Sequence, residues 1–562
     1  MNEQPLIFLW VYNEQFTPIL IPTFVTFIKP MKVESISPQH LSQLSTRDRD
    51  YLMNSDKLKE YIKYPFSYEA FSQIIEDRAH HSYDRQLLQQ VIKDQYEGLA
   101  ISDKTSKHIK ALSTPDSYTV ITAHQPSLLT GPLYYVFKIL SAINLAARLN
   151  KDFPNKHIIP VFVIGGEDHD FDEINHLHLY GKRLAWEREA IGSVGNLDTD
   201  GLNEILSEVG QVLGERSQAL DLVEALKKDV TASTTYGDFS FKLTHRLFDE
   251  LGLVILRMHD ARLKTAFIPQ MEKELTEQAS HKLVKATQDE IKSKFDYNFQ
   301  AHAREINLFH NDSKTGRNRI VFEEDRYSVL NTELSFSKNE ILTLLKSHPE
   351  RFSPNVIMRP LFQDSILPNL AYIGGGGELA YWTERKSQFE HFGIPYPMLI
   401  RRQSGMILTA SMDKQRSKLN LSIDELFKNE NDLTKLLLSS ASVPEYSLAE
   451  YKTELEQLYK KVEEHVATID PSLVKTTGAE ANKGSKSLDY LESKLKKVIK
   501  QREEVNLNRM TKLKTSLFPK GLQERHDNIF QYISDYGISI IGDLLPYCNP
   551  FDKDFKVFMP QK

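Results

Sequence analysis

The feature that most constrains this chain is a strand–helix–strand pattern between residues 118 and 165. Residues 118–122 (YTVIT) and 157–165 (HIIPVFVIG) are apolar runs typical of strands buried on both faces. Between them, Pro132 suits the first position of a helix that runs from Leu133 to about Leu149. Two such strands joined by one helix are parallel, with a right-handed crossover. The pattern therefore predicts an open α/β sheet.

Two more apolar runs extend the sheet. Residues 251–256 (LGLVIL) and 397–400 (PMLI) are candidate third and fourth strands, separated by helical patterns. The expected fold class is α/β, with a Rossmann-like parallel-sheet core over residues 31–440 and inserted connecting segments between the third and fourth strands. With 40% hydrophobic residues, 26% charged residues and a net charge of −6, the chain has an ordinary globular composition that argues against nucleic-acid binding.

The C-terminal third has another period. Apolar residues alternate spacings of three and four from Leu448 to Ile469, and a second series runs from Leu488 to Val498. We expect an antiparallel α-helical coiled-coil hairpin over residues 445–518, and a segment over 519–562 that packs back on the core. Apolar seams of this length often pack against a second chain, which favours a homodimer.

The second series is rich in lysine, which leaves two interpretations open. One is contact with a nucleic acid or nucleotide, and the other is a solvated coiled-coil face. Tyr490 is the only aromatic residue along residues 488–514, and single-stranded nucleic acids stack on several aromatic rings. The solvated face is favoured, and no nucleic-acid partner is expected.

The first thirty residues are apolar but fit neither a signal peptide nor a membrane span. Their start carries Glu3 and no basic residue, and Glu14 and Pro18 interrupt the apolar run. A second possible start, Met31, follows directly. We expect translation to begin at Met31, which makes residues 1–30 a doubtful extension, and we expect no membrane association.

The single cysteine, Cys548, excludes an internal disulfide framework. Chains without disulfides are typical of reducing compartments. A cytoplasmic location is therefore expected.

A first polar cluster, residues 122–132 (TAHQPSLLTGP), follows the first strand, where open α/β sheets bind ligands. The amides at the start of the next helix favour an anion, and Gly131 allows close backbone approach. His124 and Gln125 add side-chain donors. The alternative is a loop that only caps the helix, but a His-Gln pair at a strand end favours function.

A second cluster, residues 165–175 (GGEDHDFDEIN), follows the second strand and packs five carboxylates and a histidine into seven residues. Like charges this close need a compensating cation, such as a substrate ammonium, a divalent metal or an arginine. His169, flanked by Asp168 and Asp170, is a candidate general base. We expect Glu173 and Asn175 to point away from the ligand. The spacing matches no standard zinc motif, so metal use stays open.

A third cluster spans residues 358–382. Arg359 and Gln363 are polar residues in an apolar setting, and a run of four glycines precedes Glu378. The run is not G-x-G-x-x-G and follows no obvious strand, so a dinucleotide fingerprint is disfavoured. Arg401, directly after the fourth strand, could bind a phosphate or carboxylate.

Together these motifs resemble the bacillithiol-biosynthesis cysteine-adding enzymes, the BshC family. The matching segments are His124-Gln125, 129–133 (LTGPL), 166–170 (GEDHD), 172–175 (DEIN), 359–361 (RPL), Gly377-Glu378, Tyr381-Trp382 and 523–525 (QER). The resemblance runs from about Met31 to the C-terminus. This chain departs from the family in having AHQP at 123–126, in place of a loop with two glutamines, and a longer glycine run.

The resemblance implies a Rossmann-like core related in shape to class I aminoacyl-tRNA synthetases and a coiled coil that dimerises. It implies a ligase that joins the carboxyl group of cysteine to the amine of glucosaminyl-malate, the last step of bacillithiol synthesis. Amide formation from a free carboxylate is uphill in water, so an activated acyl group is expected, with ATP or another nucleotide as its source.

On this basis the catalytic group is His169, Asp168 and Asp170. The expected substrate-binding residues are His124, Gln125, Thr130, Gly131, Glu167, Asp172, Asn175, Arg359, Gln363, Gly377, Glu378, Tyr381, Trp382 and Arg401. Two alternatives remain: a nucleotidyltransferase acting on another small substrate, and a non-catalytic coiled-coil assembly protein. The dense carboxylate–histidine cluster argues against the second, because buried charge without a role is costly.

Overall fold

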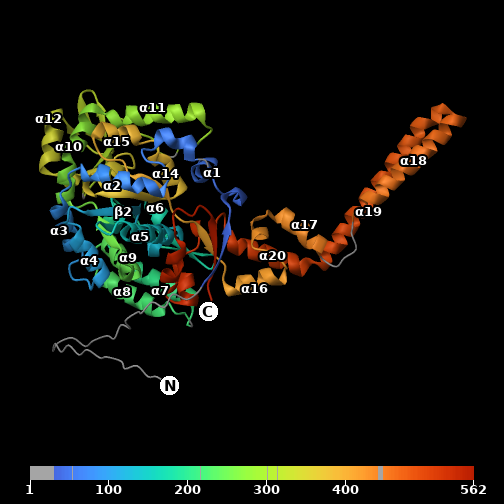
Figure 1. The fold of residues 1–562 in the computed structure, drawn as a ribbon, viewed down its shortest axis with the longest axis horizontal. Helices are drawn as coiled ribbons and strands as arrows, with labels where there is room; N and C mark the ends of the chain where they lie inside the picture. Colours follow the sequence, from blue (N-terminus) through green and yellow to red (C-terminus); the bar gives the residue numbers. More distant parts are fainter. Residues whose placement is uncertain are drawn as a thin grey trace, which may run out of the picture.

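The computed structural model describes residues 31–561 except 54, 216, 300, 313 and 441–446 (Figure 1). The expectation for residues 1–30 lies outside these described residues. Within the described ranges, no helix combines the length and apolar character needed to cross a membrane.

The centre of the molecule is a parallel sheet of five strands in the order β13-β12-β2-β3-β6. These strands are β2 (Ser117–His124), β3 (His157–Ile164), β6 (Val254–Arg257), β12 (Asn369–Gly374) and β13 (Met398–Arg401). The predicted α/β fold is confirmed. Because β3 lies on one side of β2 and β12 on the other, a crevice forms between the loops that leave β2 and β12.

The absence of a strand before the glycine run is a wrong prediction, because β12 ends at Gly374 and α14 (Gly376–Trp382) begins two residues later. The strand is hard to find in the sequence, since Asn369 and Gly374 bound an apolar run of only four residues. The glycine run is thus a strand-to-helix turn at the ligand-binding edge of the sheet.

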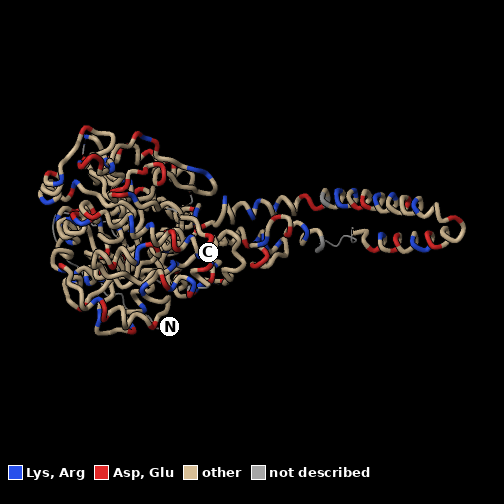
Figure 2. Tube along the Cα trace, turned by 90° about the horizontal axis from the view of Figure 1, so that it is seen from above, with Lys and Arg blue, Asp and Glu red and all other residues tan. Residues whose placement is uncertain are grey.

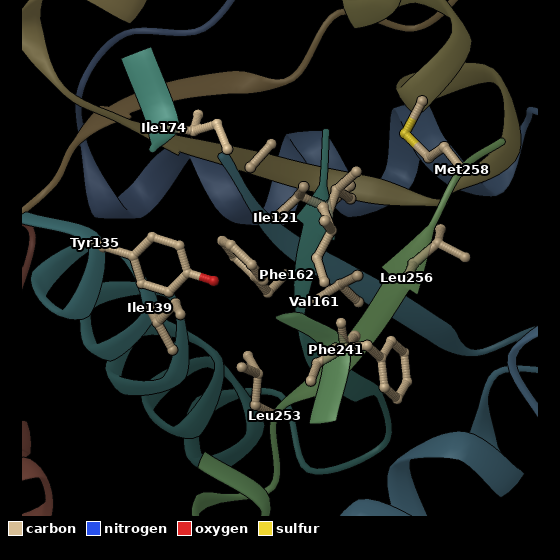
Figure 3. Close-up of a cluster of buried hydrophobic side chains, with 14 of the residues drawn as sticks. Ile121, Tyr135, Ile139, Val161, Phe162, Ile174, Phe241, Leu253, Leu256 and Met258 are labelled. Carbon is tan, nitrogen blue, oxygen red and sulfur yellow. The ribbon is translucent and has the colours of Figure 1, made fainter. Parts of the chain in front are cut away.

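Helix α5 (Tyr134–Asp152) makes the crossover from β2 to β3 and packs on both strands. Tyr135 and Ile139 of α5 point toward Phe162 of β3, and Val161 lies between that ring and Leu256 of β6 (Figure 3). Near the N-terminus, α2 packs on β12, α3 on β6, and α4 on β3 and β6. These N-terminal helices are α1 (Thr46–Met53), α2 (Phe71–Ala79), α3 (Arg85–Gln95) and α4 (Asp103–Ala111).

Two insertions interrupt the core. The first, between β3 and β6, contains α6 (Phe171–Ile174), the hairpin β4 (His176–Leu179) and β5 (Lys182–Ala185), α7 (Leu202–Leu213), α8 (Leu220–Thr231) and α9 (Tyr236–Phe248). The second, between β6 and β12, contains α10 (Ala261–Glu277), α11 (Ala279–Lys294), α12 (Lys338–Ser347), α13 (Arg359–Ile366) and a second sheet. The insertion sheet is antiparallel in the order β10-β9-β8-β7-β11. Its strands are β7 (Leu308–Asp312), β8 (Gly316–Glu323), β9 (Arg326–Val329), β10 (Ser335–Phe336) and β11 (Phe352–Pro354).

After α15 (Lys386–Phe392) and β13, the chain builds the base of the C-terminal domain. A small sheet joins β1 (Lys32–Ile36), β15 (Phe555–Met559) and β14 (Gly405–Ile407). Helices α16 (Ala410–Lys418), α17 (Glu430–Ser440) and α20 (Glu504–Leu517) surround a hydrophobic cluster of their own with this sheet. The last helices, α21 (Ile529–Tyr536) and α22 (Ile540–Leu544), belong to the main core.

A helical hairpin, α18 (Ala449–Ile469) and α19 (Val474–Arg502), projects from this base (Figures 1 and 2). The two helices pack closely, since a Cβ at Gly484 would lie 3.0 Å from Leu455 Cδ2. The coiled coil is confirmed, but the second helix begins well before Leu488. Much of the apolar seam faces solvent, with Leu458 56% and Leu491 52% exposed.

Candidate active site

A cavity of about 1190 Å³ opens at the carboxyl ends of β2, β3, β6 and β12. The residues that follow each of these strands line it, and β8 of the insertion sheet lies across from them. The loops after β2 and β3 meet directly, because the Gly165 amide donates to the His124 carbonyl at 2.8 Å. The crevice predicted from topology is therefore one polar cavity between the core and its second insertion.

The acidic loop is organised by Gln125. Its Nε2 donates to Asp168 Oδ2 at 2.8 Å and to Glu173 Oε2 at 3.1 Å. Burial opposes ionisation of Asp168, but the charge of Arg317 and the Gln125 hydrogen bond set its pKa below the usual value. The expectation that Glu173 points away is wrong, because one amide bridges the two carboxylates. The two carboxylates therefore face the cavity together.

Glu167, in the same loop, is paired with the buried Lys264 of α10. Lys264 Nζ also donates to the Phe352 carbonyl at 2.8 Å. The lysine ties the loop after β3 to the second insertion, so Glu167 has a positioning role in addition to lining the cavity.

Three histidines face the cavity from three adjacent strand ends: His124, His169 and His259. His124 Nδ1 lies 3.0 Å from the Gln125 carbonyl, so Nδ1 carries the proton and Nε2 presents a lone pair. Burial, together with the charge of Lys138, lowers the pKa of His124 to about 4. His124 is therefore a neutral ring at neutral pH.

His169 is placed differently. Arg317 Nη1 donates to its Nδ1 at 2.9 Å. Since a guanidinium has no lone pair, Nδ1 must accept, and the neutral ring then carries its proton on Nε2. In this arrangement His169 is a donor toward the cavity, which argues against its expected role as the base.

His259 follows β6 and makes no side-chain hydrogen bond within the described part of the chain. Burial lowers its pKa, and the charge of Glu167 offsets part of that shift. Its ring is therefore neutral, and both ring nitrogens can bond to a ligand at the edge of the cavity.

A buried network supports the turn after β12. Lys138, on α5, lies 2.7 Å from Glu378 Oε1, which also accepts from the Tyr372 hydroxyl at 2.8 Å. The other carboxylate oxygen accepts from the Gly375 amide at 2.8 Å. Burial opposes ionisation of Glu378, but Lys138 keeps its pKa below the usual value. Glu378 is thus a charged residue that holds the glycine turn in place through the Gly375 amide.

Arg359, at the first position of α13, lines the cavity with no carboxylate within 4 Å among the described residues. Its Nη2 donates to the Tyr381 hydroxyl at 3.2 Å and its Nη1 to Gln363 Oε1 at 3.3 Å. Both hydrogen-bond partners are neutral, and the negative charge of Glu378 acts on the guanidinium only from beyond 4 Å. This guanidinium is ready to accept an anion.

Two family models match the chain. One, described as "Bacillithiol biosynthesis BshC, N-terminal Rossmann-like domain", matches residues 31–403, and the other, described as "Bacillithiol biosynthesis BshC, C-terminal coiled-coil domain", matches residues 405–559. The chain belongs to the BshC family. The two matches meet at β14, upstream of the boundary near residue 440 that the sequence pattern suggests.

Relatives named "Putative cysteine ligase BshC" align over nearly the whole chain. The protein of Flavobacterium johnsoniae is 38% identical and covers 94% of this chain and 99% of its own length. That of Christiangramia forsetii is 38% identical over 90% of this chain and 95% of its own. That of Bacillus cytotoxicus is 27% identical over 88% and 94%. The likeness thus covers core and coiled coil together.

The structure places nine of the expected residues on the cavity of this BshC-family chain: His124, Gln125, Glu167, Asp168, His169, Arg359, Gly377, Glu378 and Tyr381. Eight others do not line it: Thr130, Gly131, Asp170, Asp172, Asn175, Gln363, Trp382 and Arg401. The sequence located the loops correctly, but it did not show which side chains within them line the cavity.

The residues away from the cavity have other partners. Trp382 is buried and stacks on Tyr372, with ring centroids 4.4 Å apart. Arg401 forms a buried pair with Asp48, at 2.7 and 3.0 Å. Asp170 and Asp172 are exposed around the start of α6. These four side chains do not contact a ligand in the cavity, because each is either buried against a structural partner or exposed to solvent.

Asn175 and Gln363 lie behind the cavity wall. Asn175 is buried and its carbonyl accepts from the Trp186 amide at 2.7 Å. Gln363 is also buried, and it contacts Asp364 at 3.2 Å as well as Arg359. Both help to position the lining residues.

Sequence reasoning missed Lys138, His259, Arg317 and Arg319. Two of them carried a usable signal: Lys138 interrupts an apolar helix, and His259 is three residues beyond the end of a predicted strand. Arg317 and Arg319 carried none, because only the packing of the inserted sheet brings β8 over the core.

Proposed function

We propose that the chain is a ligase that joins the carboxyl group of cysteine to the amine of glucosaminyl-malate, in the last step of bacillithiol synthesis. The observation that carries the proposal is the polarity of one cavity. Asp168 and Glu173 form a negative wall suited to an ammonium group, and Arg359, which has no carboxylate within 4 Å among the described residues, is a cation suited to a carboxylate or phosphate. The relatives' shared name as cysteine ligases supports this assignment.

The amine must lose a proton before it attacks an acyl carbon. Asp168 and Glu173 would bind and orient the protonated amine by charge-assisted hydrogen bonds. We assign the proton acceptor to His259, whose neutral ring has no hydrogen-bond partner among the described residues and whose protonated form is stabilised by Glu167. His169, with Nδ1 bonded to Arg317, would donate from Nε2 to the substrate.

The acyl group also needs activation, which ATP or another nucleoside triphosphate supplies when bound. The residues present fit such a group, because Arg359, with no carboxylate within 4 Å in the part of the chain that the structure describes, lines the same cavity as the glycine turn at the crevice between β2 and β12. Arg359 and the backbone of residues 375–377 would bind its phosphates. Among the described residues, no group of three or more His, Cys, Asp or Glu side chains is arranged to bind a metal ion.

We also infer a homodimer formed through the hairpin of α18 and α19. Leu458, Ile469, Leu491, Leu495 and Val498 leave a line of apolar side chains exposed along it. Contiguous apolar surface of this kind marks interaction sites. Because Cys548 is the only cysteine and is buried, we place the reaction in the cytoplasm.

The test combines product analysis with a matched pair of variants. Purified protein incubated with cysteine, glucosaminyl-malate and ATP is expected to form the amide, detected by mass spectrometry. Asp168→Asn should lower kcat/KM about 10–100-fold, because an ionic hydrogen bond of about 1.5–3 kcal/mol is lost. Asp172→Asn, an exposed neighbour in the same loop, should stay near wild type.

Release of pyrophosphate would indicate an acyl-adenylate, and release of phosphate an acyl-phosphate. Equal effects of the two substitutions would contradict the site assignment. The function itself fails if a strain lacking the gene has a normal thiol profile instead of accumulating glucosaminyl-malate.

A further inference from the structure

The wall of the cavity opposite the core is built by β8 of the insertion sheet. Arg317 and Arg319 are two residues apart on this strand, so their side chains leave the same face, and both line the cavity. Arg304, in the loop before β7, lines the same wall. The insertion sheet and the loop before it therefore present three arginines to the site, in addition to Arg359 on α13 of the same insertion.

The three arginines are not equivalent. Arg317 is fully engaged: its Nε donates to Ser353 Oγ at 3.0 Å, its Nη1 to His169, and its guanidinium lies 3.9 Å from the Phe309 ring centroid. It is also 3.7 Å from Asp168 Oδ1. Its positive charge is paired with Asp168, and its N–H groups donate to other groups of the protein.

Arg319 and Arg304 are free by comparison. Neither has a carboxylate within 4 Å or a side-chain hydrogen bond among the described residues, and Arg319 is half-buried. A half-buried guanidinium without a counter-charge is costly unless a ligand anion supplies one. This cost applies to Arg319, since Arg304 is exposed, and the two guanidinium groups on one wall fit an anion with two charged ends better than a single carboxylate.

We propose that Arg304 and Arg319 form a dicarboxylate subsite that binds the malate moiety of the acceptor substrate. This inference rests on the proposed function, and it assigns the insertion sheet the role of selecting that substrate. The cysteine carboxyl group and any phosphate would then use Arg359, at the start of α13.

The spacing along β8 agrees with the chemistry of the substrate. Arg319 is about 7 Å along the strand from Arg317, which contacts the Asp168 wall. In a glucosaminide the amine is on the carbon next to the glycosidic carbon, so in glucosaminyl-malate only a few bonds separate it from the carboxylates. Malate anchored at Arg319 therefore directs the amine toward Asp168.

The test uses the full chain and three glutamine variants. Arg319→Gln and Arg304→Gln should each raise the Kd and KM for glucosaminyl-malate about tenfold or more, and leave the KM for cysteine and the Kd for ATP unchanged. Arg326→Gln is the matched control, because Arg326 is on the adjacent strand β9, bonds to Ser335 and does not line the cavity. Arg319→Lys, which keeps the charge, should recover part of the binding.

Binding is measured by calorimetry with glucosaminyl-malate, L-malate, a methyl glucosaminide that lacks malate, and ATP. The methyl glucosaminide should bind wild type and both variants equally weakly. Unchanged glucosaminyl-malate binding in both variants, or weaker ATP binding with normal malate binding, would overturn the proposal, the second by showing a phosphate site. Because binding is measured without turnover, a wild type that binds malate through Arg319 but forms no amide would refute only the ligase function.

Discussion

Replacing Gly376 by alanine tests how the glycine turn depends on a buried ion pair beneath it. A Cβ at this position would overlap the carboxylate of Asp48, which is buried and bonded to Arg401 at 2.7 and 3.0 Å. The carboxylate must move, which loosens both hydrogen bonds. Overpacking costs about 1–3 kcal/mol and a fully broken buried pair about 3–5 kcal/mol. We expect Gly376→Ala to lower the free energy of unfolding of the core by about 2–4 kcal/mol.

The assay is urea unfolding followed by tryptophan fluorescence, since Trp382 is in α14 itself. Gly478→Ala is the control: this glycine is inside α19 with nothing near its Cβ position, so alanine should stabilise the hairpin by about 1 kcal/mol and leave the core transition unchanged. In an Asp48→Ala background, Gly376→Ala should cost less than about 1 kcal/mol. If the two substitutions instead add within about 0.5 kcal/mol, the clash with Asp48 is not the cause.

Two further predictions concern pH and assembly. Burial raises the pKa of Asp364 to about 7, so the folded carboxyl retains a proton that the unfolded chain, with a pKa near 3.8, has lost. The free energy of unfolding of the wild type therefore falls as pH rises from about 4 to 7. Asp364→Asn lacks this titration, so across that window its stability relative to wild type should rise by on the order of a few kcal/mol in thermal unfolding. A stability difference that does not change with pH would contradict this. Leu458→Glu, on the exposed seam, should convert the dimer into a monomer, measured by light scattering, whereas Glu456→Gln on the same helix should not. If the Leu458→Glu variant is still a dimer, this surface is not the dimer interface.

The core was predictable because its signals are local. A strand buried on both faces is a run of apolar residues, and the crossover rule then fixes its direction and its neighbour, as for β2 and β3. The insertion sheet was not predictable in the same way. Its strands lack a continuous apolar run: β8 (GRNRIVFE) has three polar residues followed by only three apolar ones, and such strands acquire a place only by packing against the core.

The same distinction separates the site residues. Glu167 and Asp168 are fixed by their position after a strand, which the sequence reveals. The partner of each comes from elsewhere in the chain: Lys264 from α10 for Glu167, and Arg317 from β8 for Asp168. The pKa and the tautomer of a histidine depend on these distant partners. The sequence therefore indicates which loops carry the chemistry, but not which of their histidines is the base.

The turn before α5 shows why a motif can be located correctly and given the wrong role. Leu129 and Thr130 have positive φ values of 45° and 71°, a conformation that costs about 1–3 kcal/mol for each non-glycine residue. Asn528, from the C-terminal segment, donates its side-chain amide to the carbonyls of Leu129 and Gly131, both at 2.7 Å. The strained turn is therefore held by the C-terminal segment, and neither Thr130 nor Gly131 lines the cavity. Because Asn528 is more than a hundred residues beyond the last core strand, nothing near Gly131 in the sequence could reveal this, yet the contact couples the C-terminal segment to the helix that carries Lys138.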